Sequence, residues 1–144
     1  MRARYPGVEL TVDASGDRFP EEQLTVQVDA YLWYVRKETV NDYYHLILGS
    51  TADNDASYMI AEVPGLPVGG DDRDMLRRVR VQLTAILGSP PGGERFEALT
   101  PPLRIRVTGS LFFNGYHRPE AVAPTGHEPQ TVWEIHPVSD LQTL

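Results

Sequence analysis

The strongest constraint on the fold is one amphipathic helix in the middle of the chain. Between Arg73 and Leu87, apolar side chains recur at helical spacing, which gives the predicted helix a single apolar stripe. The stripe consists of Leu76, Val79, Leu83, Ile86 and Leu87. Acidic residues crowd the predicted start, where the helix dipole favours anions, and Gly88, Pro90 and Pro91 mark the end. No other stretch of the sequence is so clearly an amphipathic helix.

Five segments with the alternating pattern of β-strands surround this helix. Three precede it and two follow it: residues 23–34, 43–49, 58–63, 103–113 and 131–138. The order β-β-β-α-β-β is typical of a small Greek-key barrel of the oligonucleotide/oligosaccharide-binding (OB) type, in which the helix plugs the barrel between strands three and four. The sequence therefore predicts a mainly β, five-stranded OB-like barrel. Its fifth strand should end at or soon after Pro137, and residues 89–102 and 114–130 should be loops.

The composition predicts one soluble domain. The length of 144 residues suits a single domain, and 41% hydrophobic with 23% charged residues is typical of a globular protein. We expect this domain to cover residues 23–144, preceded by an irregular arm or linker over residues 1–22. The absence of cysteine excludes disulfides and thiolate metal sites and favours a cytoplasmic location. No apolar run approaches the ~20 residues of a membrane span, so we expect no membrane contact.

The net charge of −7 argues against non-specific binding of nucleic acid, whose affinity comes mainly from basic side chains on phosphates. The basic residues are not evenly spread, however. Several lie on the predicted helix or alternate along the fourth strand: Arg73, Arg77, Arg78, Arg80, Arg104 and Arg106. A local basic patch therefore stays open as a hypothesis.

An aromatic face is the first candidate for function. If the more apolar side of each strand faces inward, several aromatic and basic side chains of the first three strands face outward. They are Tyr31, Trp33, Tyr43 and Tyr58, with Arg36 and Lys37 at the end of the first strand. Stacking a base on one such ring contributes about 1–3 kcal/mol, but the acidic Asp29, Glu62 and Glu134 on this face suit a protein partner at least as well. The alternative is that residues 1–22 and 114–130 cover the rings and make them a second core.

A polar site is the second candidate. On three neighbouring strands, the same alternation places His45, Glu62, Glu134 and His136 on one outward face. Two imidazoles with a carboxylate suit Zn²⁺ or another divalent metal, and a further carboxylate could act as a base. Pairing of a histidine with a neighbouring glutamate for purely structural reasons is the competing interpretation. The sequence thus favours a binding or interaction module without a cofactor over the alternative, a metal-dependent, nuclease-like hydrolase.

Four segments in the predicted strands resemble a group of small bacterial proteins of unassigned function. They are DYYHLIL, MIAEVP, a V-x-G-x-x-F-F run and WEIHPV, in this order. In that group a D-Y-H-L-V-L-like strand, an E-x-P ending and a terminal W-E-I-H-P strand recur. The resemblance covers about residues 24–138 and implies the OB-like barrel, but it names no reaction. The sequence departs from the group in its longer segment 114–130.

Overall fold

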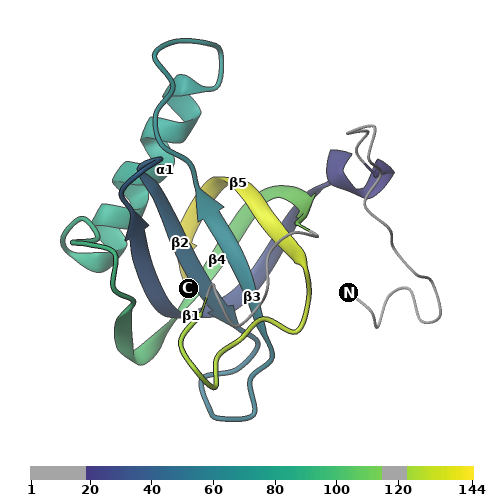
Figure 1. The fold of residues 1–144 in the computed structure, drawn as a ribbon, viewed down its shortest axis with the longest axis vertical. Helices are drawn as coiled ribbons and strands as arrows, with labels where there is room; N and C mark the ends of the chain where they lie inside the picture. The colour runs from purple at the N-terminus through teal and green to yellow at the C-terminus, as the bar shows by residue number, and fades with distance from the viewer. Residues whose placement is uncertain (1–18, 115–122) are drawn as a thin grey trace.

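The computed structural model describes residues 19–114 and 123–144, and it contains the predicted order of three strands, one helix and two strands (Figure 1). A short 3₁₀ turn, η1, precedes them. The elements are η1 (Pro20–Gln23), β1 (Thr25–Glu38), β2 (Tyr43–Gly49), β3 (Tyr58–Val63), α1 (Arg73–Leu87), β4 (Glu97–Phe113) and β5 (Trp133–Thr143). The bounds of α1, β2 and β3 are those predicted from the sequence. Within the part of the chain that the structure describes, no helix is long and apolar enough to cross a membrane.

The five strands close into a ring, which confirms the mainly β architecture. The order around the ring is β1-β2-β3-β5-β4, and β4 pairs back with β1. All neighbours are antiparallel except β3 and β5, which run parallel. In Figure 1 the strands surround a common interior, and α1 lies along one side of them. In the ring, β5 lies between β3 and β4. The connection from β3 through α1 therefore leads to β4 on the far side of β5.

The helix is fixed to the ring through its apolar stripe and through two polar side chains. Val79 and Leu83 are fully buried in the same core as the inward side chains of the strands, as predicted. Arg80 donates to the carbonyl oxygens of Asp42 at 2.8 Å and Pro64 at 3.1 Å, so it joins α1 to the β1–β2 turn and to the end of β3. Gln82 donates to the carboxylate of Asp140 at 2.8 Å and accepts from the backbone N–H of Leu141 at 3.0 Å, both on β5. The guanidinium of Arg80 is therefore used in contacts that hold α1 against the sheet.

β1, β4 and β5 all extend beyond their predicted ends, and β1 continues to Glu38. β4 begins at Glu97, where it pairs with Val35, so the second half of the predicted loop 89–102 is strand. β5 continues beyond Pro137 to Thr143, because its pairing with β4 shifts register around Gly109. Such an irregularity tolerates a proline that cannot donate to the ladder. A side chain at position 109 would place Cβ only 2.5 Å from the Pro137 carbonyl oxygen, so the close approach requires glycine.

A register shift in β1 changes which side chains face outward. The shift lies between Leu32 and Tyr34. Leu32 is buried in the core, and the next core residue is Val35, which lies three positions further on. Trp33 and Tyr34 consequently both face away from the core, and the simple alternation predicted for this strand is wrong beyond Leu32. The shift also sets Arg36 directly opposite His45 on β2.

The predicted arm and the long loop both pack on the ring where they are described. Phe19 lies edge-on to Phe113, with 5.0 Å between ring centroids, and it contacts Trp133. Glu22 accepts a hydrogen bond from the backbone N–H of Phe113 at 3.0 Å. On another side of the ring, Gln130 exchanges hydrogen bonds with the backbone of Tyr58. Residues 1–18 and 115–122, which include most of the arm and half of the loop, lie outside the described residues.

Candidate functional site

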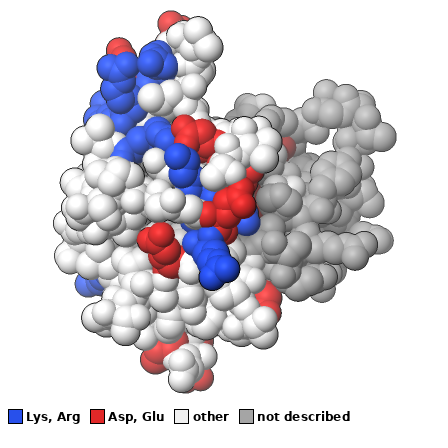
Figure 2. All heavy atoms as spheres, turned by 60° about the vertical axis from the view of Figure 1, so that its left-hand side comes forward, with Lys and Arg blue, Asp and Glu red and all other residues white. Residues whose placement is uncertain are grey.

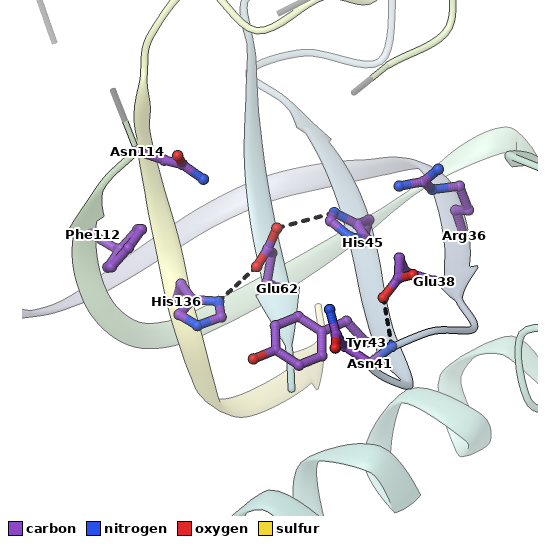
Figure 3. A pocket seen from close by; sticks show the side chains of 9 residues that line it. All are labelled: Arg36, Glu38, Asn41, Tyr43, His45, Glu62, Phe112, Asn114 and His136. Atoms are coloured by element: carbon purple, nitrogen blue, oxygen red, sulfur yellow. Dashed lines mark hydrogen bonds and ion pairs between the residues drawn. The ribbon is translucent and has the colours of Figure 1, made fainter. Parts of the chain in front are cut away.

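A pocket of about 350 Å³ lies on the outer side of the ring (Figure 3). It is centred on side chains of β2, β3 and β5 and reaches the ends of β1 and β4. The lining residues are Arg36, Glu38, Asn41, Tyr43, His45, Glu62, Phe112, Asn114 and His136. Three polar residues at its centre, His45, Glu62 and His136, alternate along their strands with core residues, and this alternation turns them outward.

The ladder of the sheet sets four polar side chains in a row across the pocket. Arg36 on β1 pairs with His45 on β2, and His45 pairs with Glu62 on β3. His136 on β5 follows the last paired position of the parallel β3–β5 ladder, so it continues the row beyond Glu62. Figure 3 shows Glu62 in the middle, with His45 and Arg36 on one side and His136 on the other.

Glu62 holds both imidazoles. Its Oε1 lies 3.1 Å from Nδ1 of His45, and its Oε2 lies 2.8 Å from Nδ1 of His136. The Glu62 side chain is 7% exposed. Burial alone raises the pKa of this carboxyl, but the contacts with His136 and His45 outweigh it and lower the pKa from 4.5 to about 2. Glu62 is therefore ionised at neutral pH, and Nδ1 of each ring faces one of its oxygens.

Aromatic rings complete the side of the pocket around His136. The imidazole of His136 lies between the ring of Tyr43, at 5.7 Å, and the ring of Phe112, at 5.2 Å, between centroids. Asn114 reaches the same region and donates to Oε1 of Glu134 at 3.3 Å. Sequence reasoning missed Phe112 and Asn114, because the register shift around Gly109 decides which residues of β4 face the pocket.

The predicted polar set is brought together only in part. His45, Glu62 and His136 meet at the centre of the pocket, whereas the carboxylate of Glu134 is buried beside Asn114 and does not line it. The two histidines contact opposite oxygens of Glu62, so the carboxylate separates them. Among residues 19–114 and 123–144, no group of three or more His, Asp or Glu side chains is arranged to hold a metal ion.

Two of the four predicted aromatic residues, Trp33 and Tyr58, lie in a second apolar cluster. Tyr58 is 5% exposed and packs with Ile47, Ile60 and the half-buried Trp33, while Trp33 donates through Nε1 to the Thr51 carbonyl oxygen at 3.0 Å. The described part of the long loop covers these rings. His127 contacts Trp33, Tyr34 and Tyr58, with 4.8–5.3 Å between ring centroids. Trp33 and Tyr58 thus lie in a second apolar cluster, which the described residues 123–130 cover in part.

The other predicted binding residues have three different settings. Tyr43 and Arg36 line the pocket. Lys37 forms an ion pair with Asp42 at 3.3 Å, at the turn that follows β1. Tyr31 is half-buried on β1, opposite Gly49 and Arg104 of the neighbouring strands, and does not line the pocket. Only two of the six predicted binding residues thus belong to the pocket.

Comparison with protein-family models, with curated proteins and with solved structures gave no match. The resemblance of the four strand segments to small bacterial proteins stays a prediction. The interpretation of the pocket therefore depends on its own geometry.

Proposed function

We propose that this chain is an OB-type binding module that recognises a protein partner through the pocket on β2, β3 and β5, as one part of a larger assembly. The observation that carries the proposal is the pocket itself. It combines oriented polar groups with the rings of Tyr43 and Phe112 on the outside of a closed sheet. Recognition sites commonly pair apolar and aromatic surface with a few fixed polar groups.

The strand order supports the OB assignment. A five-stranded ring in the order β1-β2-β3-β5-β4, with a helix between β3 and β4, is the arrangement expected for that architecture. Proteins of this architecture bind their ligands on the outer face near strands two and three, where the pocket of this chain lies. The position of the pocket therefore agrees with a binding role.

The charge distribution favours a protein over a nucleic acid. Figure 2 shows Lys and Arg side chains in a band that descends from the upper end of the molecule, with Asp and Glu side chains interleaved along its lower part. Two of the basic side chains, Lys37 and Arg80, are paired with Asp42. A phosphate backbone requires basic groups that are free to replace counterions. The rings of Trp33 and Tyr58, which could have stacked bases, pack in the second apolar cluster.

Capture of a partner tests the proposal. We expect immobilised parent protein to retain a protein partner from cell extract, and Tyr43→Ala to lose it without a change in melting temperature, because Tyr43 is a half-buried wall of the pocket. Tyr31→Ala is the matched control, since it removes a half-buried tyrosine outside the pocket, and it should retain the partner. Mass spectrometry identifies the captured protein.

Salt and nuclease distinguish the classes of partner in the same experiment. A protein interface of this kind should change little when salt is raised, whereas binding through phosphates should weaken by roughly a thousandfold between low and physiological salt. Capture that is lost on nuclease treatment, or equal capture by Tyr43→Ala and the parent, would contradict a pocket for a protein partner.

The alternative function, a metal-dependent hydrolase, has a direct test. An ion that binds only the folded protein raises its melting temperature. We expect Zn²⁺, Mn²⁺ and Mg²⁺ to leave the melting temperature of the parent unchanged, because Glu62 separates the two imidazoles. A metal-dependent rise in the parent that is absent from His45→Ala/His136→Ala would support the hydrolase instead.

A further inference from the structure

Arg36 differs from every other basic side chain in the described part of the chain. The exposed ones are solvated: Arg77, Arg78, Arg95 and Arg104. The other partly buried ones have an oxygen partner: Lys37 and Arg80 pair with Asp42, Arg106 pairs with Asp29, and Arg73 donates to the Pro67 carbonyl. The Arg36 side chain is partly buried, and it forms no ion pair and no hydrogen bond with any residue in 19–114 or 123–144.

The surroundings of Arg36 hold its guanidinium in place without neutralising it. Its Cζ lies 5.1 Å from the centroid of the Phe96 ring, which covers one side of the planar group. Its Nε is buried and has no hydrogen-bond partner among the described residues. An N–H group shielded from water without a hydrogen-bond partner is costly, so such a group is usually paired. A stacked guanidinium keeps its N–H edge available for a planar oxyanion.

The two carboxylates that line the pocket are already engaged by other donors. Glu38 lies two residues from Arg36 but accepts the backbone N–H groups of Val40 and Asn41, both at 2.9 Å. Glu62 lies within 3.1 Å of Nδ1 of His45 and within 2.8 Å of Nδ1 of His136. Arg36 is therefore the charged side chain of the pocket that has no polar partner in the described part of the chain.

We infer that the ligand of this pocket presents an oxyanion, a carboxylate or a phosphate, to Arg36. This inference rests on the proposed binding function and specifies its chemistry. A guanidinium holds such a group through two parallel N–H···O bonds, which are stronger than neutral hydrogen bonds. His45 is the cross-strand neighbour of Arg36.

Titration of the isotope-labelled protein with simple anions tests the inference. The probes are inorganic phosphate, an acetylated dipeptide with a free carboxylate, and the amide of the same dipeptide, all at constant ionic strength and pH. We expect saturable changes in the NMR signals of the Arg36 Nε–H and of the two histidine rings with phosphate or with the carboxylate, and none with the amide. The stronger of the two anions identifies the source of the oxyanion.

Variants decide whether Arg36 is the anchor. Arg36→Gln should weaken anion binding by roughly tenfold or more, whereas the control Arg78→Gln, on the exposed side of α1, should bind like the parent. If Arg36→Gln fails to fold, Arg36→Lys keeps the charge but loses the planar fork, and it should still bind several-fold more weakly than the parent.

Two results would overturn the inference: no saturable change with either anion, or equal anion binding by the parent and all folded Arg36 variants. These results are distinguishable from failure of the proposed function. A partner captured equally by the parent and Arg36→Gln would remove the oxyanion and leave the binding module intact. Absence of any captured partner would remove the proposed function, whatever the anion titration gives.

Discussion

Replacing Leu83 by alanine should lower the free energy of unfolding by roughly 2–5 kcal/mol, the usual cost of a large-to-small change in a core. Leu83 is fully buried where α1 meets the inward side chains of the ring. The loss should appear as a lower midpoint in denaturant melts, because both transfer of the side chain and the remaining cavity contribute.

The matched control for Leu83 is Arg78→Ala on the same helix. Arg78 is exposed, and a change of this kind usually costs less than about 0.5 kcal/mol. Equal losses of stability in the two variants would mean that α1 is not part of the core.

Acidification should remove a contribution of roughly 3 kcal/mol to stability as Glu62 becomes protonated. The pKa of Glu62 is lowered from 4.5 to about 2 in the folded protein, so the folded state favours the ionised carboxylate. The contribution is therefore fully present above the ordinary pKa of 4.5 and is lost as the pH falls from there towards 2. Denaturant melts across this pH range measure it.

Glu62→Gln separates this contribution from those of the other carboxylates. The variant keeps the size of the side chain but cannot ionise, so it should be less stable than the parent at neutral pH, and the difference should shrink as the pH falls. Asp55→Asn, which changes an exposed carboxylate, should follow the parent. Parallel pH profiles for the parent and Glu62→Gln would show that the contacts with the two imidazoles do not stabilise the fold.

Short-range patterns in the sequence predict most of the framework. The bounds of α1, β2 and β3 follow from periodicity and from turn residues next to them, because both signals are complete within a few residues. The same alternation places His45, Glu62 and His136 on one outward face, and the pocket contains all three. The buried stripe of α1 follows from the same kind of local signal.

The remainder depends on contacts between distant segments, which no local pattern encodes. The shift after Leu32 and the shift around Gly109 change which side chains face outward, and the second brings Phe112, which no local pattern indicated, to the pocket. The packing of His127 against Trp33 depends on the path of a loop without periodicity. Each oxygen of the Glu62 carboxylate faces a different imidazole, and this arrangement depends on side-chain distances. The sequence could therefore place the three groups together, but it could not distinguish a metal site from an ion pair.

The parallel ladder between β3 and β5 links the pocket to the order in which the chain can assemble. Ile60 pairs with Glu134 and Ala61 pairs with Ile135, so Glu62 meets His136 only after more than half of the chain has been closed into a loop. Contacts between such distant residues are entropically costly and tend to form late. The pocket consequently exists only when the ring is complete. A nascent chain that lacks β5 has no binding site. A ligand that requires the whole pocket binds and stabilises only the fully assembled ring.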